Sequence, residues 1–157
     1  MYDTAGKGAA VREDTWGGCT RRALDADTPE SEADRGAWVQ GCLDGVFNKP
    51  AALPAAAVTN RTEDSGLLQS FRAWAEENGA HESAPHVSKL TTTQLTQKDY
   101  DIELTTDYTP ETREQAADLA RDFVAWWDGD HGSNKDGTAR NVLILGADGE
   151  RLLHQRI

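Results

Sequence analysis

The sequence predicts an α+β fold in which two N-terminal helices precede a ββαββ unit with a mainly antiparallel four-stranded sheet. Three observations support this fold class. Polar and apolar residues alternate along 99–108, helical apolar stripes occur on both sides of that segment, and an apolar run at 141–145 leads into an Asp-Gly turn. We therefore expect one sheet that packs against helices in a two-layer arrangement.

The N-terminal part of the chain is predicted to be helical after an irregular start. Residues 1–27 follow neither the strand period nor the helix period, so we expect a flexible lead before a single domain that covers 28–157. A Thr-Pro-Glu sequence at 28–30 then combines a hydroxyl N-cap, a proline in the first turn and an acid at the positive end of the helix dipole. The helix that follows is expected to end before Pro50.

A second helix is predicted from Thr62 to Asn78, with Gly79 supplying a left-handed C-terminal cap. The apolar residues of both helices recur at helical spacing, so each helix should bury one face. The first stripe consists of Trp38, Val39, Cys42, Leu43, Val46 and Phe47, and the second of Leu67, Leu68, Phe71, Trp74 and Ala75.

The C-terminal part contains the predicted sheet. Strands are expected at 87–96, 99–108, 141–146 and 150–157, with a helix over 87–96 as the alternative for the first of them. The last two strands are joined by a hairpin turn in which Gly149 tolerates positive φ. A helix over 110–127 separates the two strand pairs, and its start repeats the Thr-Pro-Glu signal. Its apolar face consists of Ala116, Leu119, Ala120, Phe123, Trp126 and Trp127.

The strand over 99–108 places acidic side chains on one face, because side chains alternate between the two faces of a strand. We expect this face to be exposed to water, which makes it a candidate surface for a basic partner. A purely structural reading is also open, since acids on an exposed sheet face discourage aggregation between sheets. The candidate partner-binding residues are Asp99, Asp101, Glu103 and Asp107.

The chain has two cysteines, Cys19 and Cys42, and neither belongs to a Cys-x-x-Cys pair or a set of histidines with zinc-ligand spacing. A disulfide between them would pin the N-terminal lead to the first helix, and such a bond needs an oxidising compartment. The alternative is a pair of buried free thiols in a cytosolic protein.

The loop 128–136 brings together acids, glycines and a histidine, but it does not fit a known cation-binding pattern. When Asp128 and Asp130 are aligned with the first ligands of a calcium loop, the required glycine and the final acid are missing. His131 beside these acids could form an acid–base couple, although no activated nucleophile accompanies it. The candidate metal ligands in this loop are Asp128, Asp130, His131 and Asp136.

The formal net charge of −11 argues against a nucleic-acid partner, because a basic surface is needed to neutralise phosphates. No apolar run is long enough to insert the chain into a membrane, and no motif indicates a cofactor. The expected partner is a protein or a cationic or neutral ligand. Frequent alanine, glycine, aspartate and arginine with scarce lysine are typical of bacterial proteins from genomes rich in G and C.

These observations predict a non-catalytic binding or accessory domain that acts outside the cytoplasm, either secreted or tethered to a membrane. The acidic composition, the expected disulfide and the lack of an assembled catalytic group favour this function. Two alternatives remain open: a cytosolic interaction or regulatory module, and a metal-dependent or acid–base enzyme that uses the 128–136 loop.

Overall fold

A computed structural model of the chain describes residues 17–25, 32–46, 61–131 and 137–157. The fold is mixed α and β, with helices and an open five-stranded sheet. The chain divides into two compact units, which we call the helical unit (1–60 and 94–99) and the α/β unit (61–93 and 100–157). The sequence predicted one domain from residue 28 onward, whereas this grouping has a boundary between Asn60 and Arg61.

The helical unit contains α2 (Gly18–Asp25) and α3 (Glu32–Val46). α2 lies inside the segment expected to be irregular, and it begins after Gly17, which has a positive φ of 68°. A helix this short is marginal alone, so packing must stabilise it. Its buried residues fall on one stripe and face a small core shared with α3; the members of that core are Cys19, Ala23 and Val39, with Trp38, Cys42 and Leu43 packed against it.

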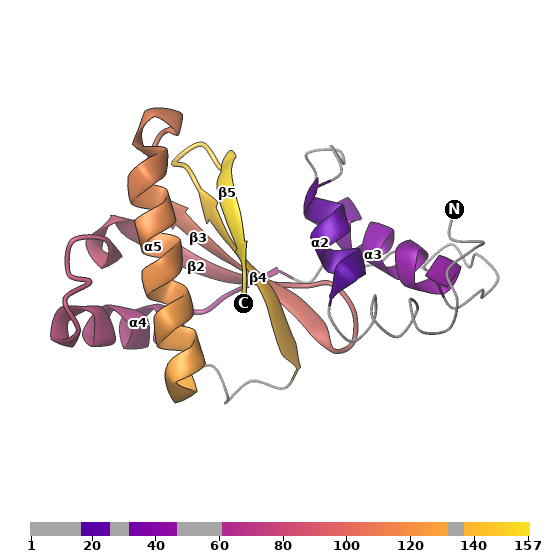
Figure 1. Ribbon diagram of the computed structural model, residues 1–157, viewed down its shortest axis with the longest axis horizontal. Coiled ribbons are helices and arrows are strands. Elements are labelled where there is room, and N and C mark those ends of the chain that lie inside the picture. The colour runs from indigo at the N-terminus through magenta and orange to yellow at the C-terminus, as the bar shows by residue number, and fades with distance from the viewer. Residues whose placement is uncertain (1–16, 26–31, 47–60, 132–136) are drawn as a thin grey trace. The chain divides into compact units, whose positions relative to one another are not determined.

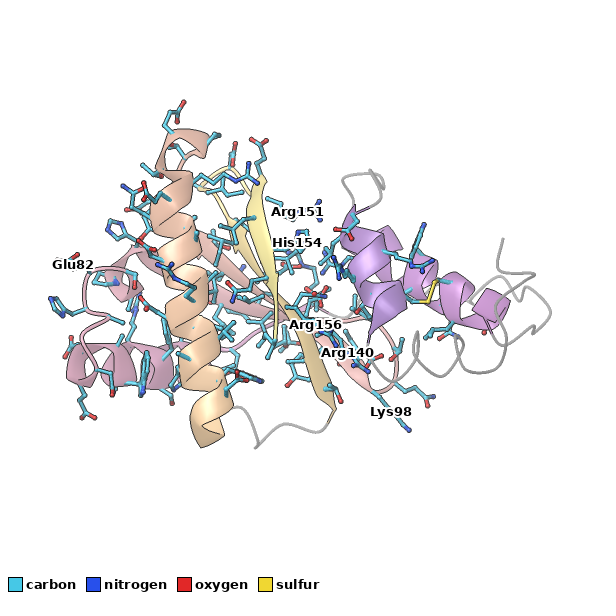
Figure 2. The ribbon with its side chains drawn as sticks, in the orientation of Figure 1. Glu82, Lys98, Arg140, Arg151, His154 and Arg156 are labelled. Atoms are coloured by element: carbon cyan, nitrogen blue, oxygen red, sulfur yellow. A yellow bond between two sulfur atoms is a disulfide. The ribbon has the colours of Figure 1, made fainter. Side chains whose placement is uncertain are left out.

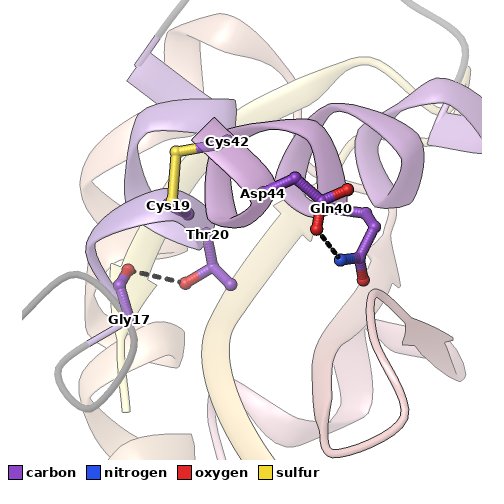
Figure 3. The surroundings of a disulfide bond; sticks show 6 residues. All are labelled: Gly17, Cys19, Thr20, Gln40, Cys42 and Asp44. Atoms are coloured by element: carbon purple, nitrogen blue, oxygen red, sulfur yellow. Dashed lines mark hydrogen bonds between the residues drawn. A yellow bond between two sulfur atoms is a disulfide. The ribbon is translucent and has the colours of Figure 1, made fainter. Parts of the chain in front are cut away.

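Cys19 and Cys42 join the two helices of this unit, as the sequence predicted (Figure 3). Their sulfur atoms lie at disulfide distance, 2.13 Å apart, and their Cα atoms are separated by 5.8 Å. At the start of α2, the Thr20 hydroxyl donates to the Gly17 carbonyl at 2.8 Å. The expected helix start at 28–30 and the last stripe residue, Phe47, lie outside the described residues.

Replacing Cys19 and Cys42 with serine is expected to lower the free energy of unfolding of the helical unit by about 3 kcal/mol, the chain-entropy cost of releasing a loop of this length. Alkylation of the native protein without reductant, followed by intact-mass measurement, tests whether the bond forms. Two alkylated thiols would contradict the disulfide. Denaturation of the α/β unit, followed separately, should be unaffected and serves as the control.

The α/β unit begins with β1 (Arg61–Glu63) and α4 (Ser65–Glu77). The sequence predicted that the helix begins at Thr62, but residues 61–63 form an edge strand that pairs antiparallel with β2. Asp64 is the N-cap, and its carboxylate accepts a hydrogen bond from the Leu67 amide at 2.9 Å. The C-terminal cap agrees with the prediction, since Gly79 has a φ of 82°.

The sheet has the order β1-β2-β3-β4-β5. It contains one strand more than the four that the sequence predicted, and the additional strand, β1, lies at the edge. The remaining strands are β2 (Val87–Gln94), β3 (Asp99–Thr106), β4 (Thr138–Leu145) and β5 (Arg151–Arg156). β4 and β5 pair antiparallel through the predicted turn, where Gly149 has a φ of 84°. Short helical turns, η1 (Ala84–His86) and η2 (Pro110–Thr112), precede β2 and α5.

β3 and β4 run in the same direction, as two side-chain hydrogen bonds indicate. Asn141 donates to Asp101 at 2.9 Å near the start of β4, and Thr106 donates to the Leu145 carbonyl at 2.8 Å at its end. Parallel neighbours need a crossover connection, which is supplied by α5 (Arg113–Trp126) and the π-helical turn η3 (Trp127–His131).

α4 and α5 lie on the same side of the sheet (Figure 1). Their aromatic side chains meet beneath the strands: the Phe71 ring lies 5.1 Å from Phe123 and 5.3 Å from Trp126. The predicted apolar face of the helix over 110–127 is therefore buried, together with Ile102 and Leu104 of β3. Among the described residues, no helix has both the length and the apolar character that crossing a bilayer requires.

Candidate functional site

A pocket of about 300 Å³ lies where the end of α4 meets the loop that leads into β2. α4 contributes Arg72 and Glu76, the loop contributes His81, and η1 contributes Ala84 and Pro85. A basic, an acidic and an imidazole side chain thus surround a small apolar wall. Pockets at the lower end of the size range for small ligands have about this volume.

The loop that forms one wall of the pocket is held in place by hydrogen bonds to three other elements. The Ala80 amide donates to the Ala75 carbonyl of α4 at 2.9 Å, and the Ser83 hydroxyl donates to Asp122 of α5 at 2.7 Å. His86, at the end of the loop, lies 2.7 Å from Asp107, just past β3. Because these bonds bridge separate elements, the wall is formed before any ligand binds.

His86, Asp107 and Tyr108 form a polar group next to the pocket loop. The imidazole of His86 packs 4.8 Å from the Tyr108 ring, and its Nδ1 lies against the Asp107 carboxylate. Burial raises the pKa of Tyr108, and the negative charges of Asp107, Asp118 and Asp122 raise it further. This phenol therefore holds its proton more tightly than an exposed tyrosine.

The raised pKa of Tyr108 predicts a loss of stability in alkaline solution. The folded state keeps the phenol proton above the pH at which the unfolded chain releases it, so this stabilisation is complete below about pH 10 and is lost as the pH rises through the folded pKa. Tyr108→Phe removes the titrating group, and its free energy of unfolding should fall less steeply above pH 10. Urea denaturation at pH 7, 9 and 11 measures the difference; equal slopes for both proteins would contradict it.

The acidic face predicted on β3 is not the exposed surface that the alternation suggested. Asp99, Asp101 and Glu103 are buried, with 7, 0 and 0% of their surface exposed, and only Asp107 is open to solvent. Asp101 accepts a hydrogen bond from Asn141 of β4. With three of the four acids buried, the expected water-exposed face is absent from this strand, and a role of the four acids in binding a partner stays a prediction.

Glu103, which like Asp101 has none of its surface exposed, connects three strands. Its Oε1 accepts a hydrogen bond from the Thr93 hydroxyl of β2 at 2.8 Å, and its Oε2 pairs with the Arg61 guanidinium of β1. A buried carboxylate is tolerated only when charged or hydrogen-bonding groups compensate it. The ion pair with Arg61 compensates the buried charge of Glu103. It also attaches the short strand β1 to the sheet.

The pocket residues were not identified as a site from the sequence. The candidate residues that the sequence predicted do not include Arg72, Glu76 or His81. In the structure, His81 lines the pocket and His86 pairs with Asp107. The sequence signal that points to this region is Gly79. Its positive φ, just after the end of α4, lets the chain turn into the loop that lines the pocket.

The 128–136 loop is only partly described. Asp128 is exposed in η3, while the side chains of Asp130 and His131, and Asp136 entirely, lie outside the described residues. Within the described part of the chain, no group of three or more histidine, cysteine or acidic side chains could hold a metal ion. The metal candidates of this loop therefore remain predictions.

Charged side chains extend from several elements of the α/β unit (Figure 2). Glu82 extends from the pocket loop, whereas Arg140, Arg151, His154 and Arg156 gather on β4 and β5. A partner's charge has to be inferred from the local surface rather than from the whole chain.

The comparisons with known proteins add no family to this description. No protein-family model matches the chain, and neither a curated protein nor a solved structure matches it. The class that the fold and the site define is a mixed α and β protein with a small charged pocket at the end of a helix.

Proposed function

We propose that this protein is a non-catalytic binding or accessory domain, secreted or membrane-tethered, and that the pocket beside α4 is its recognition site. The observation that carries the proposal is the pocket itself, with Arg72, Glu76 and His81 around an apolar wall. Binding sites typically combine such a concave apolar surface with a few polar groups that orient the ligand.

The rigidity of the pocket wall supports binding as the main task. Three hydrogen bonds hold the loop, through Ala80, Ser83 and His86, so little conformational entropy is lost when a ligand enters. Chemistry would require a nucleophile or a base aimed at a reacting atom. The Ser83 hydroxyl instead donates a hydrogen bond to the Asp122 carboxylate, a geometry that holds the loop in place.

A location outside the cytoplasm is supported by the pairing of Cys19 with Cys42 at disulfide distance. Disulfides persist in oxidising compartments and are rare in the cytosol. Subcellular fractionation of the native host, with alkylation at lysis, tests this part of the proposal. Recovery of the protein in the cytosol with both thiols reduced would overturn the location and favour a cytosolic interaction module.

An NMR screen of the full chain tests the binding site. A library of small uncharged, anionic, cationic and zwitterionic molecules is titrated into labelled protein, and amide shifts are mapped onto the sequence. Binding should move the amides of 72–86 first. The proposed site is wrong if no library molecule moves them, or if shifts arise only at 128–136, where the enzyme alternative places its site.

A further inference from the structure

The two opposite charges of the pocket lie on one face of α4. Arg72 and Glu76 are four residues apart, a spacing that brings side chains together on a helix surface and normally favours an ion pair. Here the Arg72 guanidinium donates to the Val87 carbonyl at the start of β2. In the part of the chain that the structure describes, Arg72 and Glu76 form no ion pair with each other.

The contact with Val87 has a direct consequence for the pocket. It uses one of the five N–H donors of the guanidinium and fixes the position of the group, so other donors remain for an anion. Glu76, one helical turn further on, presents a carboxylate that can accept from an ammonium group. The Cβ atoms of residues four apart on a helix are separated by about 5–6 Å, so the positive and the negative site lie on neighbouring turns of one helix face.

We propose that the pocket binds a zwitterion, an amino acid or a dipeptide, with its carboxylate on Arg72 and its ammonium group on Glu76. This inference rests on the proposed binding function and specifies its ligand class. The ligand's side chain lies against the apolar wall of Ala84 and Pro85, and His81 offers a further polar contact at the rim. A pocket of about 300 Å³ limits the ligand to this size.

A ligand that carries only one charge leaves either Arg72 or Glu76 without an opposite charge. The pocket should therefore bind zwitterions more tightly than singly charged ligands. Charge-assisted hydrogen bonds to carboxylate and ammonium groups are among the stronger polar contacts in proteins. Blocking either end of the ligand should therefore weaken binding at least tenfold. A dipeptide spans more of the distance between the two sites than a free amino acid, because each residue adds about 3.3–3.6 Å to the chain.

Calorimetric titration of the full chain with alanine, with dialanine, and with N-acetylated or C-amidated dialanine tests the ligand class. We expect at least one free zwitterion to bind and both blocked forms to bind at least tenfold more weakly. Tighter binding of dialanine than of alanine identifies a peptide ligand, and the reverse identifies a free amino acid. Equal binding of the blocked and free forms would overturn the proposal.

Variants at adjacent positions separate the pocket from the rest of the helix surface. Glu76→Gln should weaken zwitterion binding at least tenfold and leave binding of the N-acetylated form unchanged, whereas Glu77→Gln, an exposed neighbour that does not line the pocket, should change neither. An equal effect of both variants would refute the assignment of the ammonium site. Both side chains are exposed, so neither change should disturb folding.

The same experiments distinguish failure of this inference from failure of the proposed function. If no zwitterion binds but another library molecule shifts the amides of 72–86, the pocket is a binding site and the ligand class is wrong. If no molecule shifts them, both proposals fail together.

Discussion

Replacing Phe123 with alanine is expected to lower the free energy of unfolding of the α/β unit by about 3–5 kcal/mol. The Phe123 side chain is fully buried where α4, α5 and the sheet meet. Its ring lies 5.1 Å from Phe71, 5.2 Å from Trp126 and 5.9 Å from Trp127. Truncation removes all three aromatic contacts and leaves a cavity that these rigid rings cannot fill.

Urea denaturation followed by tryptophan fluorescence measures this loss, since Trp126 and Trp127 report on the core around Phe123. Val124→Ala, at the next position and only partly buried, is the matched control and should cost about 1 kcal/mol. A loss below about 1 kcal/mol for Phe123→Ala would contradict the core position.

Replacing Arg61 with alanine is expected to lower the free energy of unfolding by about 3–4 kcal/mol, close to the cost of breaking a buried ion pair. Arg61 is partly exposed, with 43% of its side chain open to solvent, whereas Glu103 is fully enclosed. The cost arises mainly from Glu103, because its carboxylate stays buried and loses its ion pair with Arg61. The short strand β1 also loses the contact that attaches it to the third strand of the sheet.

A second ion pair at the same edge of the sheet provides the control. Lys89 of β2 lies 3.5 Å from Glu63 of β1, and both side chains are about half exposed. Exposed ion pairs contribute little to stability, so Lys89→Ala should lower the free energy of unfolding by less than about 1 kcal/mol. The double variant Arg61→Ala/Glu103→Gln removes both charges and should recover part of the loss. Equal effects of Arg61→Ala and Lys89→Ala would show that burial of Glu103 does not determine the cost.

The four acids that were predicted to share one exposed face of the strand over 99–108 show the limit of what a sequence pattern predicts. Alternation along 99–108 correctly indicated a strand, and it correctly placed Ile102 and Leu104 in the core. The pattern also implied a wet opposite face, because acids are usually solvated. Glu103 is nevertheless buried, since Arg61 and Thr93 compensate it from other strands, and the partners of a side chain across a sheet cannot be read from its own segment.

Two elements were missed for a related reason. α2 spans only eight residues and β1 only three, which is too short for a period to emerge from the local sequence. α2 is stabilised by its contact with α3 and by the bond between Cys19 and Cys42. β1 is stabilised by backbone pairing with Thr91, Thr92 and Thr93 of β2.

The sequence by itself predicted the α+β class, helices over 62–78 and 110–127 that overlap α4 and α5, and the glycine turns at Gly79 and Gly149. These features depend on periodicity, capping residues and composition, which are local properties of the chain. Only the tertiary structure decided that a fifth strand joins the sheet, that Glu103 is buried, and that Arg72, Glu76 and His81 surround one pocket. Those outcomes depend on contacts between distant segments, and the free energy of a charged side chain is set by the neighbours that folding brings to it.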